Sequence, residues 1–137
     1  MYQKDYILRM IEMIAEVIAR IIGFAKKGDS KQASQILENT YRDFLKEDAS
    51  YFRKIPKDQL TTELLIKHNY TNGHLQILTE LFLVEGELQL TKNQKISAVE
   101  YFEKSLSLFE FVEKESNDFS LNLINKINKL KFHLNQL

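Results

Sequence analysis

The sequence contains no cysteine and only one proline and four glycines in its 137 residues. Without cysteine, disulfide bonds, thiolate zinc sites and cysteine nucleophiles are all excluded. Proline and glycine are the residues that most often interrupt regular structure, so their scarcity indicates long, uninterrupted elements. This composition favours helices.

An excess of either charge is also missing, because 19 Lys and Arg residues balance 19 Asp and Glu residues. Proteins that bind nucleic acids carry clustered Lys and Arg that neutralise phosphates. We therefore expect no nucleic acid partner. With 44% hydrophobic and 28% charged residues, the composition is that of a folded globular domain and excludes wholesale disorder.

Long hydrophobic runs without charges are absent as well. The most apolar stretch, residues 6–25, carries Arg9, Glu12, Glu16 and Arg20, which a membrane-spanning helix does not tolerate. The stretch also lacks the basic start and small-residue cleavage site of a signal peptide. We therefore expect a cytoplasmic protein with no membrane span. Peripheral association of this segment with a membrane is a weaker alternative, since its polar face is mixed in sign.

Apolar residues recur at helical spacing along most of the chain, which predicts an all-α fold of about six helices in antiparallel hairpins. The sequence predicts one domain over residues 1–137, with hairpins over about 6–46 and 74–115 and a C-terminal helix over about 118–137. Between the hairpins we expect a short helical turn within 49–57 and a helix over about 58–68. A compact helical bundle is the alternative architecture.

Two connections are clear in the sequence. Gly28 stands where the end of a helix favours a left-handed residue, and Asp29 begins the next helix with Gln32 three positions later, as in a capping box. Residues 69–73 combine Asn, Thr and Gly and are predicted to be the main loop.

The first and last helices carry apolar faces that raise the question of a partner. The apolar arc of the first helix is wider than one neighbouring helix covers, so it is central in the fold or pairs with another subunit. Ser116 or Asn117 can cap the last helix, whose apolar residues follow the spacing of a coiled coil: Leu123, Ile127, Leu130, Leu134 and Leu137. The run is short, which favours one more amphipathic helix that closes the core.

Two segments of the chain resemble each other. Ala33 is followed by Leu37, and Ala98 is followed by Phe102, so each segment places a small residue one helical turn before a large one. Gly86 lies twelve residues before Ala98. This pattern resembles the tetratricopeptide repeat, a pair of helices of about 34 residues.

The resemblance to the repeat is partial. Glu85, Gln89 and Ser105 stand where the repeat usually has apolar or small residues, and neither segment ends in the expected proline. Because an open repeat array needs about three units to bury its core, we expect a degenerate, self-closed relative of this fold.

The start of the chain carries a second resemblance. The segments DYILRMIE at 5–12, ARIIG at 19–23 and KKGD at 26–29 are similar to the opening of an uncharacterised bacterial family of helical proteins. Members of that family resemble tetratricopeptide proteins toward their C-terminal end. The resemblance covers most of residues 1–113 and implies a bacterial, cytoplasmic protein with a repeat-like fold. It implies no activity, because the family is of unknown function.

The sequence contains no recognisable catalytic, cofactor-binding or metal-binding motif. His68 and His74 flank the predicted loop, but neither has a second ligand one helical turn away, so exposed helix-end histidines are the favoured interpretation. Glu12 and Glu16 alternate with arginines and indicate a solvated, salt-bridged face rather than an acid–base pair. We therefore predict no catalytic residues, no cofactor and no metal.

The sequence favours a protein–protein interaction module that is not an enzyme, with a homodimer as one form of it. Aromatic residues crowd the fifth helix: Tyr101, Phe102, Phe109 and Phe111. Most must be core, and a minority is expected to line a groove between hairpins, where repeat folds bind peptides. The alternative is a small enzyme or ligand-binding protein whose pocket no local motif reveals.

Overall fold

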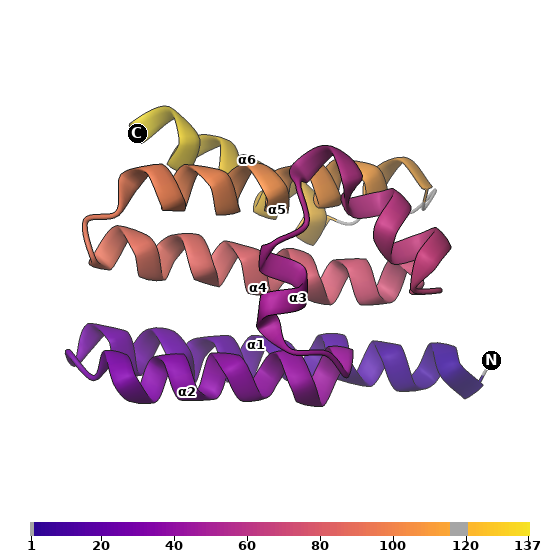
Figure 1. Ribbon diagram of the computed structural model, residues 1–137, viewed down its shortest axis with the longest axis horizontal. Helices are drawn as coiled ribbons and strands as arrows, with labels where there is room; N and C mark the ends of the chain where they lie inside the picture. Colours follow the sequence, from indigo (N-terminus) through magenta and orange to yellow (C-terminus); the bar gives the residue numbers. More distant parts are fainter. Residues whose placement is uncertain (1, 116–120) are drawn as a thin grey trace.

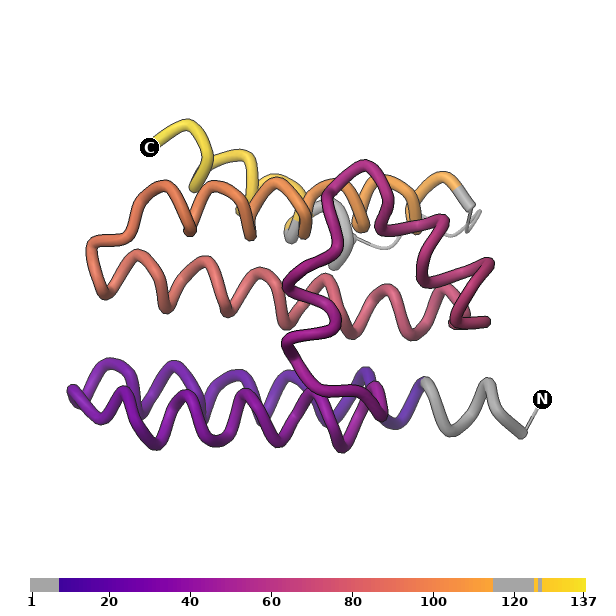
Figure 2. The backbone as a smooth tube through the Cα atoms, viewed as in Figure 1, coloured from indigo at the N-terminus to yellow at the C-terminus, as the bar shows by residue number. Residues whose placement is uncertain are grey.

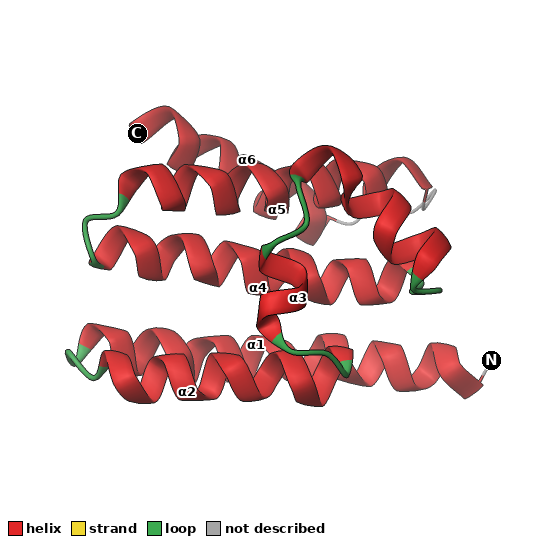
Figure 3. Ribbon diagram, in the orientation of Figure 1, coloured by secondary structure: helices red, strands yellow, loops and turns green. Residues whose placement is uncertain are grey.

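A computed structural model describes the backbone of residues 2–115 and 121–137, and side chains for 8–114, 125 and 127–137. The described residues form helices joined by short loops, with no strand among them (Figure 3), which confirms the all-α prediction. The α-helices are α1 (Tyr2–Lys26), α2 (Ser30–Thr40), α3 (Ala49–Arg53), α4 (Asn72–Thr91), α5 (Lys95–Glu115) and α6 (Leu121–Gln136).

The long helices are stacked in layers (Figure 1). Helices α1 and α2 form the first hairpin, and α4 and α5 form the second. The central helix is α4, because α1 packs against it on one side and α5 on the other, while α6 packs on α5. The short α3 crosses the direction of these helices and carries the chain from the first hairpin to the second (Figure 2). We call residues 49–55, which are α3 and the two residues after it, the crossing segment.

The turn between α1 and α2 forms as the sequence predicts. Gly28 has a φ of +86°, in the left-handed region that glycine enters without steric cost. The backbone N–H of Asp29 donates to the carbonyl of Phe24 at 2.9 Å and so closes the end of α1. The Asp29 carboxylate accepts from the backbone N–H of Gln32 at 3.1 Å and caps α2. The helices therefore turn back on each other within a few residues.

The connecting region is less regular than the predicted helix over 58–68. It consists of a 3₁₀ turn at Lys57–Gln59 and a π-helical turn at Thr62–Lys67, and a second π-helical turn, Tyr41–Leu45, extends α2. These irregular turns still bury apolar side chains, since Leu60 and Leu64 are fully buried. Local apolar spacing predicts that a segment is helical, but it does not distinguish an α-helix from the tighter and wider turns that this segment adopts.

The predicted loop over 69–73 is shorter in the structure, because α4 already begins at Asn72. Thr71 caps the helix: its Oγ1 accepts from the backbone N–H of His74 at 3.5 Å, and its own N–H donates to Nδ1 of His74 at 3.0 Å. Asn72 and Gly73 favour loops in isolation, but this capping box draws both of them into the first turn of α4.

The last helix closes the core, as the favoured interpretation expected. Ile127 and Leu130 are buried in a cluster with Phe102 and Phe109 of α5. Leu123 and the predicted caps Ser116 and Asn117 lie outside the described residues or side chains.

The first helix is covered only in part. Met10, Ile14 and Ile21 are buried, whereas the side chain of Leu8 is 49% exposed. Ala15 and Ala19 are exposed on the same side as Leu8, and Ile11 and Ile22 are half-buried there. Within the described chain, α1 therefore has both a core face and an apolar face without a neighbour.

Helices α4 and α5 pack closely together at Gly86, which faces the ring of Phe102. A Cβ atom at Gly86 would lie 2.4 Å from Cε1 of Phe102, far inside van der Waals contact. Ala98 is fully buried, as expected for a small residue at a helix crossing. Three of the residues that indicated a repeat, Gly86, Ala98 and Phe102, therefore lie in the packed interface of the second hairpin.

We predict that Gly86→Ala destabilises the protein by about 2 kcal/mol, because overpacking a core usually costs 1–3 kcal/mol. Gly23→Ala in α1 is the matched control, since its Cβ would meet no atom within 4 Å. The control should be neutral or stabilise by up to about 1 kcal/mol through helix propensity. Urea unfolding measures both, and a Gly86→Ala variant as stable as the control would contradict the packing of α4 on α5.

Candidate functional site

The most unusual polar group in the structure is Glu85, which lies in the middle of the apolar helix α4. Its side chain is only 5% exposed. Oε2 of Glu85 accepts from Nε of Arg53 on α3 at 2.7 Å and from the phenol of Tyr41 at 2.9 Å. A buried carboxylate requires such partners, because burying an unpaired charge costs several kcal/mol.

Arg53 connects this buried group to the first hairpin. Its second donor, Nη2, contacts Oε2 of Glu38 on α2 at 2.5 Å. Nζ of Lys104 on α5 donates to the backbone carbonyl of Arg53 at 2.9 Å. The guanidinium also lies 5.6 Å from the centre of the Tyr41 ring, within the range of a cation–π contact. Helices α2, α4 and α5 therefore all contact Arg53 of α3.

The charges in this network shift one another's proton affinities. Burial raises the pKa of Glu85, although the Arg53 guanidinium acts in the opposite direction. Burial lowers the pKa of Arg53, but its bonds to Glu85 and Glu38 outweigh this and raise the pKa overall. Burial and the neighbouring Glu85 also raise the pKa of Tyr41. Arg53 and Tyr41 consequently keep their protons, and both donate to Glu85.

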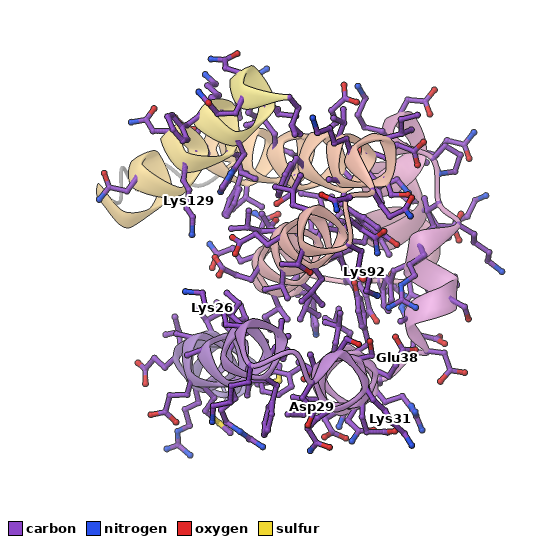
Figure 4. All side chains as sticks on the ribbon, turned by 90° about the vertical axis from the view of Figure 1, so that its left-hand side faces the viewer. Lys26, Asp29, Lys31, Glu38, Lys92 and Lys129 are labelled. Atoms are coloured by element: carbon purple, nitrogen blue, oxygen red, sulfur yellow. The ribbon has the colours of Figure 1, made fainter. Side chains whose placement is uncertain are left out.

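A cleft of about 330 Å³ opens beside the network. Its walls come from both hairpins and from the crossing segment: Ser34, Leu37, Glu38, Arg53, Glu85, Leu88, Gln89, Lys92 and Tyr101. Figure 4 shows Glu38 and Lys92 on the side of the molecule where α3 crosses. The lining combines polar and apolar side chains, and Tyr101 is one of the aromatic residues of α5 that the sequence indicated for a groove.

The histidines that the sequence singled out lie elsewhere, around Tyr70. The ring of Tyr70 contacts both of them, with centroid distances of 4.2 Å to His68 and 4.6 Å to His74. Nε2 of His68 donates to Oε2 of Glu47 at 2.9 Å, and Nδ1 of His74 accepts in the capping box of α4. Both are half-buried rather than exposed. Across the described ranges, no group of three or more His, Asp or Glu side chains is arranged to hold a metal ion.

The charged line on α1 stays at the surface. Arg9, Glu12, Glu16 and Arg20 are all exposed, and none of them is part of the cleft lining. In the part of the chain that the structure describes, no helix has both the length and the apolar character needed to cross a bilayer.

The sequence did contain one signal for the site. Glu85 and Gln89 were two of the residues that depart from the repeat pattern, and both line the cleft. The third departure, Ser105, is fully buried and donates to the carbonyl of Thr79 at 2.7 Å. A polar residue in an apolar helix therefore indicated a special environment, but Arg53, 32 positions away, could not be identified as its partner.

Comparisons of the chain with protein-family models, with curated proteins and with solved structures find no match. Both resemblances seen in the sequence therefore remain predictions, and the function is inferred from the chain's own residues.

We predict that Arg53→Met destabilises the protein by about 3 kcal/mol, because it leaves Glu85 buried without its cation. The double variant Arg53→Met with Glu85→Gln should recover much of that loss, since the remaining buried side chain is neutral. Arg42→Met is the matched control, because its ion pair with Asp48, at 3.4 Å, lies at the surface. The control should cost less than about 1 kcal/mol. Equal losses for Arg53→Met and Arg42→Met in urea unfolding would contradict the assigned network.

Proposed function

We propose that the chain is a non-catalytic protein–protein interaction module that holds a segment of its partner in the cleft between α2, α3, α4 and α5. The observation that supports this proposal most is the composition of the cleft wall. Helices of both hairpins and α3 contribute to it, with apolar side chains beside hydrogen-bonding ones. Sites on proteins that recognise other proteins combine such contacts.

The size of the cleft agrees with this proposal. Sites for small molecules and cofactors have volumes of about 300–1,000 Å³, and the cleft, at about 330 Å³, lies at the lower limit. It suits a few side chains of a docked segment better than a large cofactor.

The chemistry of the cleft supports binding better than catalysis. A buried carboxyl with a raised pKa is a feature of some acid–base residues. Here, however, Arg53 and Tyr41 occupy one oxygen of Glu85, and the second guanidinium contact goes to Glu38. The described residues that line the cleft include neither a histidine nor a cysteine. The ion network fixes helices in place, and the remaining lining groups are suited to recognition.

Selection from a random peptide display library tests the proposal. Peptides selected on the wild-type protein should bind in the cleft, so Ser34→Trp, which fills it, should weaken them at least about tenfold, a loss of about 1.4 kcal/mol. Asn125→Trp is the matched control, because Asn125 is exposed on α6, away from the cleft lining. Fluorescence anisotropy gives the affinities, and circular dichroism checks both folds. Peptides that bind Ser34→Trp as well as the control would contradict the proposed site.

The exposed face of α1 supports a second candidate, self-association with another copy of the chain. Leu8, Ile11, Ala15, Ala19 and Ile22 recur on one side of α1 at helical spacing, and none of them is fully buried. Small residues at Ala15 and Ala19 allow two helix backbones to approach closely.

We predict that Ala15→Arg abolishes self-association, because it places a charge at the centre of this face. Arg9→Ala, on the polar side of α1, is the control and should leave the mass unchanged. Size-exclusion chromatography with light scattering gives the mass in solution. A wild-type monomer at millimolar concentration would contradict the second candidate.

A further inference from the structure

Three charged side chains form one cluster in the lining of the cleft. Glu38, Arg53 and Glu85 are in direct contact there, so two carboxylates share one guanidinium. When all three are ionised, this cluster carries an excess of one negative charge. The two acids differ in burial: the side chain of Glu85 is 5% exposed, whereas that of Glu38 is 39% exposed.

Both carboxylates also keep an oxygen for a further contact. The bonds from Arg53 and Tyr41 to Glu85 end on Oε2, and the bond from Arg53 to Glu38 ends on Oε2 as well. Among the described residues, no hydrogen bond reaches Oε1 of either side chain, and both residues line the cleft. An ionised carboxylate accepts about four hydrogen bonds, so each of them has room for another donor.

The positive charge of Arg53, by contrast, is already shared between two carboxylates. Nε and Nη2 are bonded to Glu85 and Glu38. An anionic group that entered the cleft here would therefore be repelled by two carboxylates, and the one guanidinium beside them is already paired with both. A cationic group would meet two free carboxylate oxygens, and it would relieve the cost that burial imposes on Glu85.

The rim of the cleft has the opposite charge. Lys92, the residue that follows α4, is exposed and lines the cleft, and no ion pair is formed by it within the described ranges. Gln89, one turn earlier on α4, lies in the lining between this cation and the inner carboxylates. Along the cleft, the wall therefore changes from negative to positive.

We propose that the cleft recognises a basic side chain of a partner protein, Arg or Lys, which binds Glu85 and Glu38, while an acidic residue beside it in the partner segment pairs with Lys92. This inference rests on the proposed function and gives the chemistry of the segment. A protein segment fits better than a free amine. Lys92 at the rim requires a negative group in the ligand, and that group must lie at a fixed distance from the ligand's basic group. Charge-assisted contacts of this kind fix the position of the bound segment along the cleft and also contribute to its affinity.

Four ligands test the inference by nuclear magnetic resonance titration of the full chain. Two are pools of capped decapeptides, one with a central Arg or Lys followed by Asp or Glu, the other with a central Asp or Glu followed by Arg or Lys. The other two are butylguanidinium and putrescine, which supply the cation alone. The first pool should bind at least about tenfold more tightly than the other three, which is the scale of one charge-assisted contact.

Variants locate the two contacts. Glu38→Gln keeps an acceptor for Arg53 but removes the negative charge, so the affinity for the first pool should fall about fivefold or more. Lys92→Glu removes the rim cation, so the ratio between the affinities for the first pool and for butylguanidinium should fall. Glu103→Gln is the matched control, because Glu103 pairs with Lys57 on the surface of α5 at 3.7 Å and is not part of the lining. Nitrogen-15 spectra confirm that each variant is folded.

The outcomes separate this inference from the proposed function. Preference for the second pool, or an unchanged affinity in Glu38→Gln, overturns the inference while peptide binding in the cleft still stands. If butylguanidinium or putrescine binds as tightly as the first pool, the claim that the cleft recognises a protein segment is overturned. If no peptide of either pool shifts the resonances of cleft residues, the proposed function itself fails.

Discussion

The contact between Arg53 and Glu85 is the constraint on which the rest of the structure depends. Glu85 lies on the central helix and Arg53 on the short crossing helix, and their side chains meet at 2.7 Å with Glu85 almost fully buried. A helix of five residues is too short to be stable by itself. The segment is held by this ion pair and by Phe52, which is fully buried against Tyr41. If α3 moved, Glu85 would lose its cation and the cleft would lose one of its walls.

Helix α4 allows this arrangement because its neighbours cover different sides of it. Helices α1 and α5 bury its apolar residues on two sides, and the crossing segment covers a third. Most of α4 is accordingly apolar, and its fully buried polar side chains are hydrogen-bonded. Glu85 accepts from Arg53 and Tyr41, and the hydroxyl of Thr79 donates to the carbonyl of Leu75 in the same helix. One helix thus supplies both the centre of the core and the floor of the candidate site.

Much of the fold could be predicted from the sequence, because it depends on local patterns. Helical spacing located the long helices, and Gly28 with Asp29 located the first turn. The irregular turns around Tyr41 and Leu64 could not be predicted, since tertiary packing selects them. The same holds for the site: Glu85 was visible as a polar residue in an apolar helix, but Arg53 and Tyr41 lie 32 and 44 positions away. Contacts over such separations leave no periodic signal in a single sequence.

Native-state hydrogen exchange in wild-type protein and in Glu85→Gln tests the central role of the ion pair most directly. The informative amides are those of Tyr51, Lys54 and Ile55, whose hydrogen bonds hold the crossing segment. If the ion pair fixes that segment, these amides should lose protection in Glu85→Gln far more than the amides in the middle of α1. An equal loss throughout the chain, or unchanged protection of the three amides, would contradict the account.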